Sequence, residues 1–131
     1  MEHSCEAAVI TCIDFRFWKK LIQFLSTQGL ESYDLTAMAG GAKNLVDGDT
    51  REMVFRQLDI CTGKHEIKKV YLINHIDCGA YGGSAAFGSS EKEEIKLTED
   101  LNQAENIIKE KYPSLQTVKL LMEFDQTRVL K

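Results

Sequence analysis

The stretch IKKVYLINHIDCGAYGG, residues 67–83, decides how the rest of the chain is interpreted. Residues 67–75 are rich in apolar and β-branched residues, which predicts a buried strand that ends at His75, with Cys78 just beyond it. The glycines that follow leave three interpretations open: a metal site, a phosphate-binding loop, or a turn after a strand. A phosphate-binding loop is disfavoured, because the stretch contains neither Gly-x-Gly-x-x-Gly nor Gly-Lys-Ser/Thr.

Strands and helices are predicted to alternate around this stretch. Besides 67–75, apolar patterning predicts strands over residues 7–13, 33–39, 117–124 and, briefly, 128–130. Helical spacing predicts helices over 16–28, 49–64 and 91–112, with loops at 40–44 and 79–90. This order predicts an α/β fold with one domain over residues 1–131, in which helices cover the faces of a mostly parallel central sheet of four to five strands.

The composition is typical of a globular protein. Of the 131 residues, 44% are hydrophobic and 27% are charged, with a net charge of −4. The absence of a dense Lys/Arg block argues against nucleic acid or an anionic membrane as a partner. The sequence contains no apolar run of the roughly 18 residues that span a bilayer and no signal-peptide pattern, so we expect a cytoplasmic protein. In that reducing compartment, four cysteines suggest metal binding or catalysis more than disulfides.

Three side chains with metal-binding chemistry are predicted to meet at one edge of the sheet. Cys12 falls at the end of the first predicted strand, and His75 and Cys78 at the end of the third. Ligand sites of open parallel sheets lie beyond the carboxyl ends of the strands, so the three converge if these strands are neighbours. Two thiolates and an imidazole suit zinc and leave a fourth position open. Taken singly, Cys12 would more often be a small core residue than a ligand, and His75 more often a hydrogen-bonding group.

The segment CIDFR, residues 12–16, adds two charged groups beside Cys12. Asp14 and Arg16 lie two positions apart at the turn into the next helix. Arginine can hold a carboxylate by two parallel hydrogen bonds, and a carboxylate so held could accept a hydrogen bond from a metal-bound water or compete for the metal. The alternative is a helix N-terminal aspartate beside a solvated arginine. Of the other cysteines, Cys5 is interpreted as a terminal thiol and Cys61 as part of the core-facing side of its helix.

Four segments of the chain resemble β-class carbonic anhydrases. CIDFR resembles the Cys-x-Asp-Ser-Arg motif of that family, and HIDCG, residues 75–79, resembles its His-x-x-Cys-Gly motif. AMAGGAKNLVDG, residues 37–48, is similar to the family's Asn-Ala-Gly-Asn loop, and LLMEFDQTRVL, residues 120–130, to its last strand pair. The resemblance runs from about residue 7 to the end and identifies the chain as a minimal, N-terminally short member.

The resemblance implies a cofactor, a reaction and an assembly. One Zn²⁺ per chain would be held by Cys12, His75 and Cys78, with water or, in a closed state, Asp14 in the fourth position. Asp14 and Arg16 would be the catalytic pair, with Arg16 drawing Asp14 away from the metal. The implied reaction is reversible hydration of carbon dioxide to bicarbonate by a zinc-bound hydroxide. The implied assembly is a homodimer or a larger homo-oligomer.

The resemblance also implies a substrate pocket, bordered by Phe15, Ala39, Gly40, Gly41 and Gly79. Two of these residues depart from the family pattern. Phe15 replaces a serine, which makes the rim more apolar, and Gly41 replaces an asparagine.

Two other functions stay open at this stage. The same zinc site could hydrolyse carbonyl sulfide or carbon disulfide, which are linear and apolar like carbon dioxide. A non-catalytic, zinc-stabilised domain is disfavoured, because a structural zinc would not need the pair Asp14 and Arg16. Hydration also requires a proton to reach solvent, and His3 and His65 are candidate shuttles that the sequence does not place near the zinc.

Overall fold

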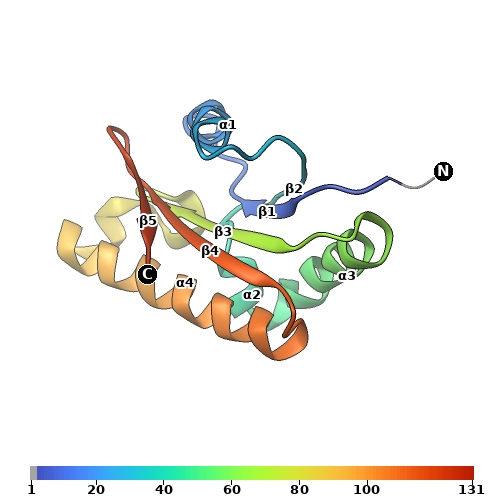
Figure 1. The fold of residues 1–131 in the computed structure, drawn as a ribbon. Coiled ribbons are helices and arrows are strands. Elements are labelled where there is room, and N and C mark those ends of the chain that lie inside the picture. The colour runs from blue at the N-terminus through green and yellow to red at the C-terminus, as the bar shows by residue number, and fades with distance from the viewer. Residues whose placement is uncertain (1–2) are drawn as a thin grey trace.

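The centre of the molecule is a sheet of five strands in the order β2-β1-β3-β4-β5 (Figure 1). We describe it in a computed structural model, which places residues 3–131. The strands are β1 (Ala7–Thr11), β2 (Tyr33–Ala37), β3 (Lys69–His75), β4 (Gln116–Met122) and β5 (Thr127–Leu130). The first four are parallel to one another, and β5 is antiparallel to β4. The predicted α/β fold with its mostly parallel sheet is therefore confirmed, including the short fifth strand.

Helices cover both faces of this sheet. Helix α1 (Trp18–Thr27) lies on one face, and α2 (Lys43–Val46), α3 (Gly48–His65) and α4 (Ser90–Lys111) lie on the other (Figure 1). Two short 3₁₀ helices, η1 (Gly79–Tyr81) and η2 (Ser84–Phe87), follow β3. None of the helices within residues 3–131 is long and apolar enough to cross a bilayer.

Two predicted loops are partly helical, which corrects the sequence-based assignment. The segment 40–44 was expected to be a loop, but α2 begins at Lys43. Its turn is closed by the side-chain amide of Asn44, which donates to the carbonyl oxygens of Ala39 and Gly41 at 2.9 Å each. The segment 79–90 was also expected to be a loop, but it contains η1 and η2. A left-handed glycine follows each of these short helices and ends it.

Alternate residues of the strands pack into two separate apolar cores. Val9 and Ile73 belong to the core beneath α1, whereas Ile10 and Leu72 belong to the core beneath α2, α3 and α4. Strands that are buried on both faces have nearly continuous apolar sequences, which explains why they were recognisable from the sequence. Cys61 is buried in the second core, as its helical position predicted.

The strand order places an opening between β1 and β3. The chain leaves the carboxyl end of β1 through α1 on one face of the sheet, and it leaves the carboxyl end of β3 through η1, η2 and α4, with α4 on the other face. Connections that diverge in this way leave a crevice beyond the carboxyl ends of the two strands. The prediction of a metal site required the first and third predicted strands to be neighbours, and β1 does pair directly with β3.

Candidate metal centre

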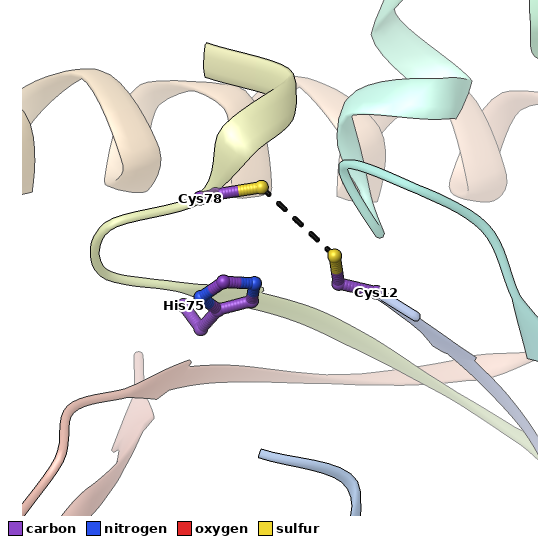
Figure 2. Close-up of side chains that lie close together, drawn as sticks. All are labelled: Cys12, His75 and Cys78. Carbon is purple, nitrogen blue, oxygen red and sulfur yellow. Dashed lines mark hydrogen bonds between the residues drawn. The ribbon is translucent and has the colours of Figure 1, made fainter. Parts of the chain in front are cut away.

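Cys12, His75 and Cys78 come together at this crevice (Figure 2). Cys12 follows the last residue of β1, His75 is the last residue of β3, and Cys78 lies in the turn after β3. The two sulfur atoms are 4.0 Å apart, and the ligand atoms of all three residues lie within 4.8 Å of one another. All three side chains are buried. The group could therefore hold a metal ion.

The orientation of His75 leaves one ring nitrogen without a partner. Its Nδ1 lies 2.6 Å from the carbonyl oxygen of Ile76 and can only donate to it, so we assign the proton to Nδ1. Its Nε2 is buried and has no hydrogen-bond partner among the described residues. Buried polar atoms are rarely left unpaired, and a metal ion would satisfy this one. The ring is held by stacking on Phe17, with the ring centroids 4.3 Å apart.

The two thiols also fit a zinc ion. Two sulfur ligands at about 2.3 Å from a tetrahedral zinc are about 3.8 Å apart, which is close to the separation of Cys12 and Cys78. Contact with the Cys78 thiol lowers the pKa of Cys12 despite burial, and His75 and the backbone N–H of Gly40 lower it further. The same contact, together with burial, raises the pKa of Cys78. One thiolate is thus favoured even without a metal, and a cation would favour the second.

The glycine loop between β2 and α2 contacts Cys12 through its backbone. The backbone N–H of Gly40 donates to Cys12 Sγ over 3.4 Å. Gly41 has a left-handed φ of 54°, and a Cβ built on it would collide with the carbonyl oxygen of Ile73. The loop can therefore approach β1 and β3 this closely only with glycine at position 41.

The variant Gly41→Ala is expected to lower the free energy of unfolding by about 3 kcal/mol, because the backbone collision must be relieved by moving β3 or the loop. Chemical denaturation monitored by circular dichroism measures the change. Gly63→Ala is the matched control, because Gly63 lies on an exposed turn of α3 with open space around it. That control should gain about 0.5–1 kcal/mol from helix propensity. Equal stability of both variants would contradict the collision.

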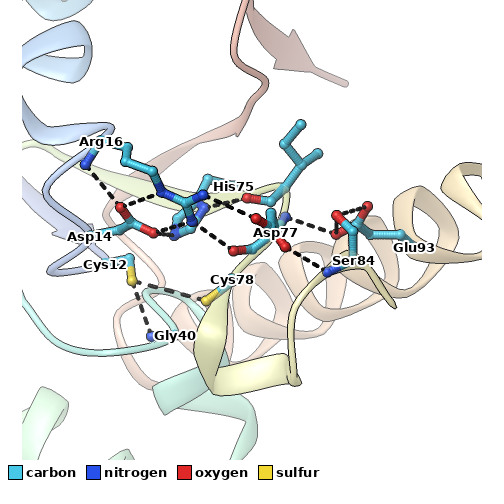
Figure 3. A network of polar contacts seen from close by, with 10 residues as sticks. Cys12, Asp14, Arg16, Gly40, His75, Asp77, Cys78, Ser84 and Glu93 are labelled. Carbon is cyan, nitrogen blue, oxygen red and sulfur yellow. Dashed lines mark hydrogen bonds and ion pairs between the residues drawn. The ribbon is translucent and has the colours of Figure 1, made fainter. Parts of the chain in front are cut away.

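Asp14 and Arg16 form a two-point ion pair beside Cys12, His75 and Cys78 (Figure 3). Arg16 Nε donates to Asp14 Oδ1 over 3.0 Å, and Nη2 donates to Oδ2 over 2.7 Å. These hydrogen bonds are the main reason why the pKa of Asp14 is lowered to about 2. Asp14 Oδ2 lies 3.7 Å from His75 Nε2, so an ionised carboxylate borders the unpaired nitrogen.

The arginine is itself held by a chain of contacts that the sequence did not reveal (Figure 3). Arg16 Nη1 and Nη2 donate to the Asp77 side chain and carbonyl oxygen over 3.0 and 2.9 Å. Asp77 Oδ1 accepts from the backbone N–H of Ser84, and the N–H of Asp77 donates to Glu93, each over 2.8 Å. Glu93 lies in the first turn of α4, whose start is capped by Ser89. Only the place of Asp77 inside HIDCG could have suggested its role.

A cavity of about 560 Å³ opens onto this centre. It is lined by Cys12, Ile13, Asp14, Phe15, Arg16, Ala39, Gly79 and Ala80. The structure thus places Phe15, Ala39 and Gly79 on the cavity wall, whereas Gly40 lies against Cys12 and Gly41 packs against β3. The Phe15 ring is 80% exposed at the rim.

His3 and His65, the two candidate proton shuttles, lie at the other edge of the sheet. The suggestion that they carry protons from the candidate metal centre is therefore wrong. His65 ends α3, and its Nδ1 lies 2.6 Å from Asp34 Oδ2 near the start of β2. The His3 ring packs edge-on against His65, with the ring centroids 4.7 Å apart. Both histidines therefore lie at the amino ends of the parallel strands, opposite Cys12, His75 and Cys78. The spacing in the sequence could not show the direction in which α3 returns to the sheet.

Comparison with known proteins establishes the family. A family model described as "Putative carbonic anhydrase" matches residues 2–129. The chain belongs to this carbonic anhydrase family. The resemblance of its motifs to carbonic anhydrases is thereby confirmed.

The chain is also similar to individual proteins and solved structures. An uncharacterised protein of Rickettsia bellii (strain RML369-C) is 34% identical, over 89% of this chain and 76% of the relative. A carbonic anhydrase of Streptococcus mutans superposes with a TM-score of 0.68 at 18% identity, over 99% of this chain and 84% of that one. A carbon disulfide hydrolase superposes with a TM-score of 0.58 at 16% identity, over 100% and 80%. The solved structures show that the chain has the β-carbonic anhydrase fold.

Proposed function

We propose that this protein catalyses the reversible hydration of carbon dioxide with one zinc ion held by Cys12, His75 and Cys78. The observation that carries the proposal is the buried, unpartnered Nε2 of His75 beside two thiols and an ionised carboxylate. Zinc bound there would supply a Lewis acid that lowers the pKa of water towards about 7. Family membership supports the same reaction.

Asp14 would orient the attacking water. Its carboxylate is ionised at neutral pH, since Arg16 lowers its pKa further below neutrality, to about 2, so it can only accept hydrogen bonds. A water that donates to Asp14 Oδ2 has its remaining lone pair turned away from the carboxylate and available for the carbon of the substrate. Arg16 would act as a positioning residue, because its two side-chain hydrogen bonds to Asp14 fix the plane of the carboxylate.

The cavity suits a small apolar substrate and a charged product. Ile13, Phe15 and Ala39 provide an apolar wall, which a linear and uncharged gas can enter without loss of hydrogen bonds. Arg16 lines the same cavity and would offer a positive charge to bicarbonate formed there. Stopped-flow measurement of carbon dioxide hydration by zinc-replete protein tests the proposal. A rate equal to the uncatalysed reaction, with zinc bound, would refute it.

The apolar rim favours a second candidate reaction, the hydrolysis of carbonyl sulfide or carbon disulfide with release of hydrogen sulfide. Phe15 stands where the resembling motif has serine, and its ring is exposed at the mouth of the cavity. A carbon disulfide hydrolase is among the proteins of similar fold. The values of kcat/KM for hydrogen sulfide release and for carbon dioxide hydration, measured on one zinc-replete sample, decide between the two reactions.

An exposed apolar surface beside the cavity supports a proposed homodimer. β2 is an edge strand, and its Leu35 is 52% exposed next to Trp18 of α1, which is 53% exposed. Together with Ile13 and Ile22, these residues line an apolar groove of about 310 Å³ that also includes Cys12. Apolar patches of this kind and unpaired strand edges mark interfaces. A second copy of the chain would cover this surface close to the metal ligands.

Light scattering at micromolar concentration should therefore give a mass of at least twice the 14.8 kDa of one chain. The variant Leu35→Glu is expected to shift the protein to monomer, because a carboxylate cannot be buried unpaired in an apolar interface. Ile60→Glu is the matched control, because Ile60 is 53% exposed on α3, away from this surface. A wild-type monomer with full activity would contradict the proposed dimer.

A further inference from the structure

A second group of metal-binding side chains lies at the opposite edge of the sheet. Cys5 precedes β1, Asp34 lies near the start of β2, and His65 ends α3. Their ligand atoms all lie within 4.8 Å of one another. We propose that Cys5, Asp34 and His65 form a second metal site, which binds a zinc-class divalent cation.

The donor set selects the class of metal. A thiolate, an imidazole and a carboxylate are a borderline-soft combination that zinc accepts, with a fourth position left for solvent. Calcium and magnesium require sets of oxygen ligands, which this group lacks.

The backbone around the three residues is held by hydrogen bonds on both sides. The N–H of Cys5 donates to the carbonyl oxygen of His65 over 3.0 Å, which ties the start of β1 to the end of α3. The N–H of Glu6 donates to Ser32 over 3.1 Å, and Lys68 donates to Glu6 over 3.0 Å. The ligand-bearing segments are therefore fixed relative to one another before any metal binds, so binding need order only side chains.

The side chains can reach a coordinating arrangement by small movements. In the metal-free arrangement, Asp34 Oδ2 and His65 Nδ1 are 2.6 Å apart. Ligand atoms around a tetrahedral zinc are about 3.3–3.8 Å apart, so this pair would open by about 1 Å, and Cys5 Sγ already lies within 4.8 Å of both. All three residues are only half-buried, so rotation about their side-chain bonds is not blocked by core packing.

A solvent-open cavity borders Cys5, one of the three proposed ligands. A surface cavity of about 320 Å³ is lined by Ser4, Cys5, Glu6, Ser32, Glu66 and Lys68. Two carboxylates and one ammonium on its wall leave a net negative charge, which attracts a cation.

Cys61, the cysteine that belongs to neither group of candidate ligands, provides a matched control. Cys61 lies near Asp34, but it is buried in the core, and its sulfur is not one of the mutually close ligand atoms. The proposal therefore requires that Cys5→Ser affects metal binding at this edge and that Cys61→Ser does not.

The decisive experiment uses the full chain without an affinity tag, in a Cys12→Ser, Cys78→Ser background that lacks the first thiol ligands. Titration with Co²⁺ should show one equivalent bound per chain, with the absorption band of a cobalt–thiolate bond. Adding Cys5→Ser should abolish the band, and adding Cys61→Ser should leave it. A folded background protein that binds no Co²⁺, or a band that survives Cys5→Ser, would overturn the proposal.

A second measurement covers the case in which the background variant does not fold. Zinc-saturated wild-type protein is dialysed and its zinc content measured beside Cys5→Ser and His65→Ala. Each variant should contain one zinc per chain fewer than wild type, in samples with unchanged circular dichroism. Equal zinc contents would overturn the second site. Because the comparison depends only on Cys5 and His65, its outcome is independent of whether the protein hydrates carbon dioxide.

Discussion

Replacing Cys78 by serine is expected to remove one zinc per chain and to reduce carbon dioxide hydration to the uncatalysed rate. Changes to residues that only support a metal ligand typically weaken metal binding 10–100-fold, so loss of a ligand should cost more than about 100-fold. Serine is nearly the size of cysteine but does not ionise at neutral pH, so the variant removes the ligand with little change in packing. Cys12→Ser should behave in the same way, because the two sulfur atoms belong to one buried pair.

Zinc analysis after dialysis, paired with stopped-flow hydration, measures both effects. Cys61→Ser is the control for a buried thiol outside the first cluster, and it should keep the zinc content of wild type. Addition of a strong chelator to wild type should reproduce the Cys78→Ser result, and zinc should restore activity to the chelated protein but not to the variant. Full zinc content and full activity in Cys78→Ser would show that the metal binds elsewhere.

The second large effect is expected from Asp14→Ala. The variant should keep zinc but lose the acceptor that orients the water, with a decrease in kcat on the order of 10²-fold or more. Arg16→Ala should also keep zinc and lose most activity, because the freed carboxylate of Asp14 can then occupy the fourth ligand position. Arg16→Lys should have a kcat between those of wild type and Arg16→Ala, since an ammonium keeps the charge but cannot make the two parallel hydrogen bonds.

Zinc content has to be measured in each of these samples, so that loss of metal is not mistaken for loss of orientation. A zinc-replete Asp14→Ala variant with wild-type kcat would contradict the role proposed for the pair. An Arg16→Ala variant with unchanged kcat would show that the pair with Asp77 and Asp14 is structural only.

The convergence of Cys12 and His75 at the strand ends was predictable for a topological reason. A parallel sheet brings the carboxyl ends of neighbouring strands to one edge, so Cys12 and His75 meet although 62 residues separate them. The strands were recognisable because both faces of the sheet are covered, which requires apolar side chains at nearly every position.

The supporting contacts were not predictable, because they depend on the path of irregular backbone. Asp77 adopts a left-handed φ of 55°, and this turn brings it to Arg16, 61 positions earlier. Glu93 reaches Asp77 only because η1 and η2 fold the intervening segment back toward the start of α4. The position of His65 similarly depended on where α3 ends rather than on any local pattern.

The unequal cover of the two faces has a consequence for motion. α1 alone covers one face of the sheet, whereas three helices cover the other. Segments with less apolar packing open locally at lower free energy, so amide hydrogens of α1 should exchange with solvent faster than those of β3. Asp14 and Arg16 precede α1, whereas the thiols and the imidazole are attached to the central strands. Gentle warming should therefore disturb the orientation of water before it releases the metal.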